Sequence, residues 1–250
     1  MRILLVNDDG VHSPGLVALK RVFSARFGPV SVVAPARQQS GMAHSITLHD
    51  AIEVRSLGKE GEVVSFAVDG TPADCVKLAV GALLKTPPSL VVSGINLGAN
   101  VGINVIYSGT VAAALEASAL GFPALAISLD YSPRPDFDLA AQIAMDLIER
   151  LPREVLAPGR AINVNIPACR RDDIRGLYVG RQDLSPYAER FDVVPTAGGM
   201  SIRILGDVQH REGEISTDLQ ALRAGYITIT PLKYDLTDDV LLERMKSMKL

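Results

Sequence analysis

Two adjacent carboxylates, Asp8 and Asp9, directly follow a predicted buried strand over residues 2–6. An apolar run that ends in charge is typical of a parallel strand, and ligands of open α/β sheets bind outside the carboxyl ends of such strands. Carboxylates this close repel one another unless a cation neutralises them, and Mg²⁺ or Mn²⁺ prefers such oxygen ligands. Alternatively, one Asp caps the helix expected near Gly15 while the other is solvated.

Two further loops follow apolar strands and are expected to converge on the same crevice. One holds Ser40 and Gly41, and the other ends in Asn96. With the two carboxylates, the Ser40 hydroxyl and the Asn96 amide oxygen form an all-oxygen set that suits an octahedral hard cation. Asn7, directly before the acidic pair, and Gly41 are candidates for contact with a substrate.

A phosphate site is indicated by Ser108, Gly109 and Thr110, where a glycine-rich loop becomes a helix predicted over residues 110–120. Backbone N–H groups at a helix N-terminus point outward and carry partial positive charge, and the two hydroxyls add donors. The alternative for Thr110 is simple N-capping, because a cap and a phosphate site use the same geometry.

The composition excludes several classes of protein. The chain has 250 residues, of which 48% are hydrophobic and 21% charged, with a net charge of −3. No apolar stretch approaches the roughly 20 residues of a membrane helix, and no basic run is interleaved with aromatic residues. We therefore expect no membrane span and no binding of extended nucleic acid. Cys75 and Cys169 fit neither a disulfide framework nor a zinc site, and we expect a cytoplasmic location.

Strands and helices alternate along the chain with short connections. This pattern predicts an α/β fold with a Rossmann-like, doubly wound and mainly parallel sheet. We expect a single domain, with an α/β core at residues 1–166 that carries the active site and an extension at residues 167–250. Strands are predicted over 2–6, 30–34, 52–55, 63–68, 90–92, 124–128, 161–166 and 226–231, and helices over 16–27, from 72, over 110–120, over 138–151, from 218 and from 238.

An ordered series of short motifs covers nearly the whole chain. It comprises residues 6–10 with 14–15, 34–35, 39–41 with 46–48, 70–75, 92–96 with Gly98 and Asn100, 107–111 with Glu116, 163–165 with Pro167, 217–218, 225–226 and 231–232. This series resembles the SurE family of metal-dependent survival-protein phosphatases, which act on nucleoside monophosphates. An ordered series of this kind is far more specific than any single motif.

The resemblance implies a single divalent metal ion per subunit, Mg²⁺ or Mn²⁺, bound by Asp8, Asp9, Ser40 and Asn96. It implies phosphate contacts from residues 108–110 and hydrolysis of nucleoside 5′-monophosphates, with 3′-monophosphates and short polyphosphate as further candidate substrates. It also implies a homodimer or homotetramer in which the C-terminal extension is exchanged or paired between subunits. The chain departs from many relatives at residue 39, where Gln replaces Arg.

The expected chemistry is attack on phosphorus by a metal-activated water, with Asp9 as the candidate acceptor of its proton. His12, His44 or water remain open as the general acid. One rival is an aspartyl-phosphate mechanism with Asp8 as nucleophile, although that scheme usually separates its two aspartates by one residue. Another is a receiver-like Mg²⁺-binding phospho-switch without hydrolytic function, but the strand at residues 90–92 ends in Ser93 rather than Asp.

Apolar, strand-like residues in the extension predict an oligomerisation arm. They include Val193, Val194, Ile202 and Ile204, with a hairpin tip at Gly198 and Gly199. A hairpin outside the core is marginal in water and gains stability by pairing with another subunit.

Overall fold

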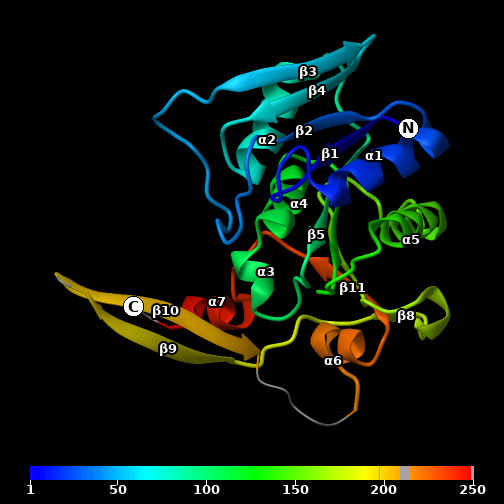
Figure 1. The fold of residues 1–250 in the computed structure, drawn as a ribbon. Helices are drawn as coiled ribbons and strands as arrows, with labels where there is room; N and C mark the ends of the chain where they lie inside the picture. Colours follow the sequence, from blue (N-terminus) through cyan, green and yellow to red (C-terminus); the bar gives the residue numbers. More distant parts are fainter. Residues whose placement is uncertain (197, 209–213, 249–250) are drawn as a thin grey trace.

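The computed structural model describes residues 1–196, 198–208 and 214–248. In this part of the chain nine strands form a single sheet in the order β3-β4-β2-β1-β5-β6-β7-β11-β8 (Figure 1). Their bounds are β1 Ile3–Val6, β2 Ser31–Pro35, β3 Val54–Glu60, β4 Val63–Val68, β5 Leu90–Leu97, β6 Ala124–Leu129, β7 Ala161–Ile166, β8 Leu177–Val179 and β11 Ile227–Leu232.

The predicted doubly wound sheet is confirmed by the pairing of its central strands. Strands β4, β2, β1, β5, β6 and β7 run parallel, while β3 and β11 are antiparallel to their neighbours β4 and β7. The chain moves outward in one direction from β1 to β2 and then returns to place β5 on the other side of β1. The strand order therefore reverses between β1 and β5, which is where doubly wound sheets bind ligands.

Helices cover both faces of the sheet (Figure 1). Helices α1 and α5 pack on one face, and α2 and α4 pack on the other, each over its own apolar cluster. The bounds are α1 Pro14–Phe27, α2 Pro72–Leu78 with a π turn at Ala79–Leu83, α3 Asn104–Tyr107, α4 Gly109–Ala119, α5 Phe137–Arg150, a 3₁₀ turn at Arg171–Asp173, α6 Asp218–Arg223 and α7 Asp239–Lys246.

The strand predicted over residues 90–92 is longer, and the glycine-rich loop expected between it and the helix at residue 110 is partly regular, which corrects the prediction. Strand β5 continues to Leu97, and the short helix α3 precedes α4. The pairing of β5 with β6 shifts register between Ser93 and Asn96. Glycine and asparagine occur at this irregularity, so the sequence has the composition of a loop although the backbone still pairs as a strand.

The end of β5 is held by two close backbone approaches. A Cβ atom on Gly15 of α1 would lie 2.1 Å from the carbonyl oxygen of Ile95, and one on Gly94 would lie 2.3 Å from that of Ile127. Gly94 also has φ of +138°, which L side chains rarely adopt. Only glycine fits at these two positions, and the two contacts fix the backbone directly before Asn96.

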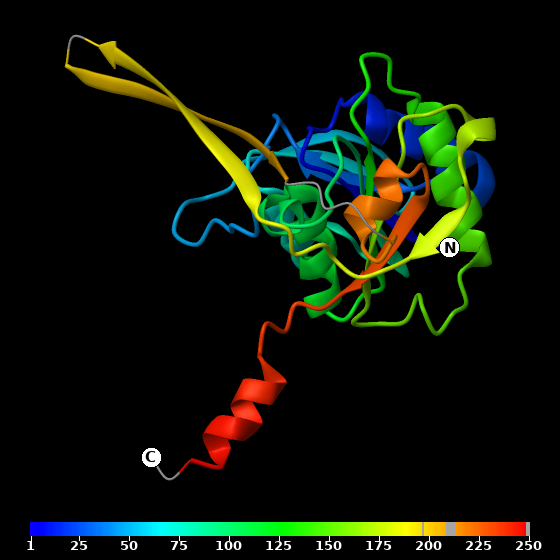
Figure 2. The same cartoon turned by 90° about the horizontal axis from the view of Figure 1, so that it is seen from below.

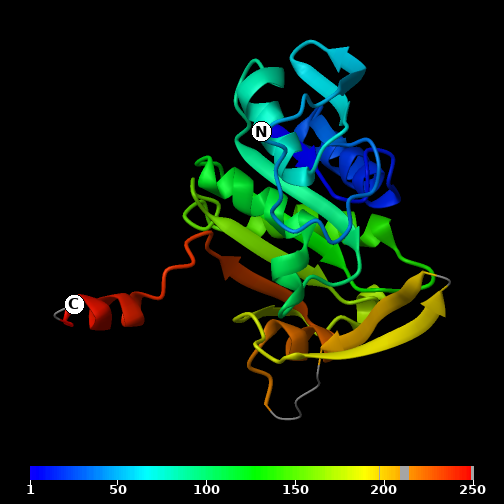
Figure 3. The ribbon, with the colours of Figure 1, turned by 90° about the vertical axis from the view of Figure 1, so that its left-hand side faces the viewer.

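Two segments after residue 166 project from the body (Figures 2 and 3). Within the described residues, strands β9 (Tyr187–Thr196) and β10 (Gly199–Val208) pair with one another and with no other strand, and they form an antiparallel arm. Helix α7 has no buried residue. Strands β8 and β11, in contrast, join the main sheet, so residues after 166 contribute both to the body and to the projections.

Candidate active site

Asp8 and Asp9 lie at the carboxyl end of β1, beside the point where the strand order reverses. Asp8 is buried and accepts a short hydrogen bond from the Thr110 hydroxyl. Asp9 is half-buried and accepts from the Leu97 backbone N–H and from Gln38 Nε2, each at 3.4 Å. These two long contacts leave the Asp9 carboxylate able to accept further hydrogen bonds or bind a cation. The Asp8 carboxylate, in contrast, is held in place by Thr110.

The loop between β2 and β3, residues 36–53, brings Ser40 to this site. Gln38 Nε2 donates to Ser40 Oγ at 2.9 Å and also to Asp9, so a single amide bridges the two candidate ligands. The Gln39 backbone N–H donates to the Asp8 carbonyl oxygen at 2.7 Å. Gly41 has φ of +73° and turns the loop after Ser40.

Asn96 is the penultimate residue of strand β5, next to Leu97, whose backbone N–H donates to Asp9. Its Nδ2 donates to the Gly98 carbonyl oxygen at 2.7 Å. With its nitrogen engaged in this way, the amide oxygen Oδ1 remains available as a ligand.

The candidate phosphate cradle is the start of α4. Ser108, not Thr110, is the N-cap residue, and its hydroxyl accepts from the Val111 N–H at 3.1 Å. The alternative that Thr110 is the N-cap is therefore corrected. Its side chain is fully buried and its hydroxyl donates to Asp8, while a contact of Thr110 with phosphate stays a prediction. A Cβ atom on Gly109 would lie 2.9 Å from Asp8 Cβ, so the helix start and the acidic pair are in direct contact.

Asn7 is fully buried, and its Nδ2 donates to the Gly10 carbonyl oxygen at 2.9 Å and to Ser13 Oγ at 2.7 Å. These bonds brace the turn that follows the acidic pair. Asn7 Oδ1 is buried without a hydrogen-bond partner among the described residues. This orphaned acceptor implies a donor that the chain itself does not supply, such as ordered water.

The electrostatics of the acidic pair favour a cation. Burial raises the pKa of Asp8 to about 6, against the hydrogen bond from Thr110 and with support from the charge of Asp9. Burial also raises the pKa of Asp9. Across residues 1–196, 198–208 and 214–248, neither carboxylate forms an ion pair, and no cluster of three His, Cys, Asp or Glu side chains occurs. Two carboxylates supplemented by neutral oxygens fit a hard divalent ion.

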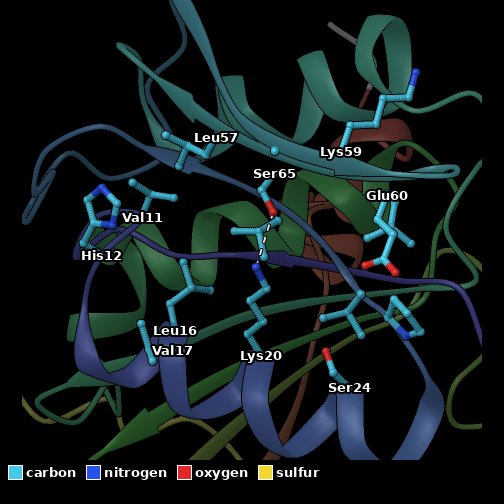
Figure 4. Close-up of a pocket in the computed structure, with 15 residues that line it drawn as sticks. Val11, His12, Leu16, Val17, Lys20, Ser24, Leu57, Lys59, Glu60 and Ser65 are labelled. Atoms are coloured by element: carbon cyan, nitrogen blue, oxygen red, sulfur yellow. Dashed lines mark hydrogen bonds between the residues drawn. The ribbon is translucent and has the colours of Figure 1, made fainter.

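The two histidines considered as general acids occupy different surroundings. His12 lines a groove of about 650 Å³ between α1 and the β3–β4 hairpin. The residues around this groove are drawn in Figure 4. His44 Nε2 lies 2.9 Å from Glu116 Oε2, and Lys77 Nζ lies 2.7 Å from the other oxygen of Glu116. The His44 pair ties the β2–β3 loop to α4.

Asp74 holds the same loop from α2. Its carboxylate accepts from the backbone N–H groups of Thr47 and Thr71, at 2.9 and 3.0 Å, and from the Thr47 hydroxyl at 2.8 Å. Thr71 completes a capping box by accepting from the Asp74 N–H. Burial opposes ionisation of Asp74, but these hydrogen bonds outweigh it and lower its pKa.

Replacing Asp74 by Asn is expected to lower the free energy of unfolding by about 1 kcal/mol at pH 7. Because the folded-state pKa is lowered, the carboxylate stabilises the fold above the unfolded pKa of about 3.9 and loses this effect as pH falls through the folded value. Urea unfolding between pH 3 and 7 should therefore show the difference between wild type and variant shrinking below about pH 4. A difference that is constant over this range would contradict the assignment.

Several contacts could not be read from the sequence. Three of these contacts link separate segments of the chain. Gln38 contacts Asp9, Asp74 contacts Thr47, and Glu116 contacts His44. Asp74 was marked by the Thr-Pro-x-Asp capping pattern, and both Asp74 and Glu116 lie in the ordered motif series, but neither signal indicated the contact that the residue makes.

Comparisons with known proteins identify the family of the chain. Residues 3–189 match the family model described as "Survival protein SurE". The chain is 42% identical to the 5′-nucleotidase SurE of Syntrophobacter fumaroxidans, over 95% of each chain, and 42% identical to that of Rhodopirellula baltica, over 100% of this chain and 99% of the relative. The crystal structure of the SurE protein from Aquifex aeolicus superposes with a TM-score of 0.83 at 36% identity, over 98% of each chain. The chain belongs to the SurE family.

Proposed function

We propose that this protein is a divalent-metal-dependent phosphatase that hydrolyses nucleoside 5′-monophosphates. Relatives that are 42% identical carry the name 5′-nucleotidase. The observation that carries the proposal is the direct contact of the α4 N-terminus with the acidic pair, through Thr110 and Gly109. A phosphate bound at that helix start would lie beside both carboxylates.

Asp8, Asp9, Ser40 and Asn96 are the residues that would hold one Mg²⁺ or Mn²⁺ ion. Such an ion supplies Lewis-acid polarisation of a phosphoryl oxygen and lowers the pKa of bound water. Support comes from the buried acids without an ion-pair partner in the described ranges and from the free Oδ1 of Asn96.

The other residues bind and orient the substrate. The first N–H groups of α4, at Gly109 and Thr110, have no partner within the helix; that of Thr110 is directed at the Asp8 carboxylate, and that of Gly109 can donate to a phosphate oxygen. Asp9 is the better candidate than Asp8 for accepting a proton from the attacking water, because it is more exposed and its hydrogen bonds are long. Asn7 braces the turn beneath them.

The test is a screen of phosphate release from 5′-, 3′- and deoxynucleoside monophosphates and short polyphosphate, with Mg²⁺, with Mn²⁺ and with chelator. Release from 5′-monophosphates that requires added metal supports the proposal. Release that persists in fully demetallated protein, or no release from any nucleotide, would refute it.

We further propose that the extension after residue 166 assembles two or four subunits. Cross-strand partners lie on the same face of a two-stranded arm, and three such pairs make one face of the β9–β10 arm apolar. These pairs are Phe191 with Ile204, Val193 with Ile202, and Pro195 with Met200. All of these hydrophobic side chains except Pro195 are more than half exposed, while Val194 shares the opposite face with Ser201 and the Asp192–Arg203 pair. Helix α7 adds exposed Val240, Leu241 and Met245.

Replacing Ile202 by Asp should dissociate the assembly because it places charge on the apolar face of the arm. Ser201→Asp is the matched control, since it adds the same charge one residue away on the opposite face. Light scattering at micromolar concentration should give a dimer or tetramer for wild type and the control, and a smaller species for Ile202→Asp. A monomeric wild type would contradict the proposal.

None of the described helices combines the length and apolar character needed to cross a membrane. Location in the cytoplasm stays a prediction.

A further inference from the structure

The segment from residue 98 to residue 103, here called the β5–α3 loop, joins the candidate ligand Asn96 to α3 and the phosphate cradle. Asn100, in its middle, is fixed by the sheet. Its backbone N–H donates to Asn165 Oδ1 at 2.7 Å, its carbonyl oxygen accepts from Asn163 Nδ2 at 2.7 Å, and its side chain donates to Ser128 Oγ at 2.8 Å. The first half of the loop is therefore tied to β6 and β7.

The second half of the loop is tied to the C-terminal part of the chain through Gly102. The Gly102 N–H lies 3.3 and 3.2 Å from the two carboxylate oxygens of Asp218. Its carbonyl oxygen accepts from Gln182 Nε2 at 2.7 Å. Next to it, Val101 packs against Leu219 and Leu222 of α6.

Asp218 is a fully buried carboxylate that the proposed chemistry does not use. Besides Gly102, its Oδ1 accepts from the backbone N–H groups of Asp183 at 2.8 Å and of Leu219 at 2.7 Å. Burial raises its pKa against these hydrogen bonds. Burying a carboxylate is costly unless its oxygens are hydrogen-bonded. Three backbone N–H groups satisfy both oxygens of Asp218 and join three segments of the chain at this side chain.

Asp183 connects Asp218 with the residues directly before the arm. Its carboxylate accepts from the Thr217 hydroxyl at 2.6 Å and from the Ser185 N–H at 2.6 Å. Ser185 is buried and lies two residues before β9. One continuous set of hydrogen bonds thus runs from the start of the arm, through Asp183 and Asp218, to Gly102 in the β5–α3 loop.

We propose that Asp218 is a positioning residue that couples the placement of the β9–β10 arm to the geometry of the β5–α3 loop, and through it to Asn96 and the phosphate cradle. This inference rests on the proposed phosphatase function for its kinetic consequences. Subunit contacts that move or fix the arm would then alter catalysis without touching the substrate.

The substitution Asp218→Asn isolates this role. Asn keeps the shape of the side chain and an oxygen that can still accept from Asp183 and Leu219. Its amide nitrogen would take the place of Oδ2 and face the Gly102 N–H, donor against donor. The Gly102 N–H would keep only its 3.3 Å contact with Oδ1, so the change should weaken the contact with the loop and spare the contacts of Oδ1 with Asp183 and Leu219.

We expect Asp218→Asn to lower kcat/KM for a 5′-monophosphate about tenfold. Amide hydrogen exchange over residues 98–103 should accelerate about tenfold, while the midpoint of thermal unfolding changes little. Asp136→Asn, at the N-cap of α5, is the matched control because it removes the same charge where Asn caps equally well. If Asp218→Asn does not fold, Gln182→Ala removes the other contact to Gly102 and should give the same local exchange.

Coupling is tested by combining Asp218→Asn with Ile202→Asp in the arm. In the wild-type background Ile202→Asp should change kcat/KM, and in the Asp218→Asn background it should change it no further. Equal factors in both backgrounds, no kinetic effect of Ile202→Asp, or unchanged exchange over residues 98–103 would each overturn the inference. A protein without phosphatase activity would refute the proposed function. Hydrogen exchange over residues 98–103 needs no substrate, so it would still test whether Asp218 positions the β5–α3 loop.

Discussion

Asp8→Asn is expected to lower kcat for nucleoside monophosphates about a thousandfold while the protein remains folded. The substitution removes one of two carboxylates from the candidate metal site and keeps an oxygen that can accept from Thr110. Stability should not fall, because burial raises the pKa of Asp8 and the loss of one of two neighbouring acids relieves repulsion in the metal-free protein.

The measurements are phosphate release, Mn²⁺ affinity by calorimetry and the midpoint of thermal unfolding. Asp69→Asn serves as the control, since Asp69 pairs with Arg37 at the exposed surface and not with the acidic pair. Chelator should abolish wild-type activity, and Mg²⁺ or Mn²⁺ should restore it. Wild-type turnover in Asp8→Asn would remove Asp8 from the catalytic site.

Gly109→Ala is expected to lower kcat/KM about a hundredfold, although alanine is the better helix former. The new Cβ would lie 2.9 Å from Asp8 Cβ, 3.1 Å from Pro72 Cγ and 3.2 Å from Asp8 Oδ2. Either the start of α4 or Asp8 must move, so both phosphate binding and the carboxylate position change. KM should rise and kcat should fall together.

Gly81→Ala is the matched control, because a Cβ at that position meets nothing within 4 Å and its φ is not positive. It should leave kinetics unchanged. Steady-state kinetics on both variants, with the folded fraction measured by circular dichroism, make the comparison. Normal kinetics in folded Gly109→Ala would show that the turn has only a structural role.

The sheet and the place of the site follow from patterns that are local in sequence. Apolar runs mark the strands, and their alternation with helices predicts a parallel sheet whose strands end at one common edge. The motifs after these strands carry the candidate ligands, and the structure adds that β1 and β5 are neighbours at that edge. This reasoning needs only the periodicity of the sequence and the rules for connecting parallel strands.

The contacts that shape the site could not be predicted in the same way. Thr110 reaches Asp8 across 102 positions, and Gly102 reaches Asp218 across 116. Such contacts depend on side-chain rotamers and on how closely helices approach the sheet, which periodicity does not specify. The continuation of β5 to Leu97 was missed for a related reason, because glycine and asparagine at a register shift have the composition of a loop.

The hydrogen bonds that hold the β5–α3 loop also set an order of events during synthesis. All four candidate ligands and the phosphate cradle lie within the first 110 residues. Gly102, however, can form its hydrogen bonds only after Gln182 and Asp218 have been synthesised. At about 5–20 residues per second, a growing chain needs about 5–20 seconds to add the segment between Thr110 and Asp218. Immature chains on the ribosome would therefore carry all four ligands while the β5–α3 loop still lacks these hydrogen bonds, and arrested chains that end at residue 166 should not hydrolyse nucleotides. Nucleotide pools would be exposed to the enzyme only after its synthesis is nearly finished.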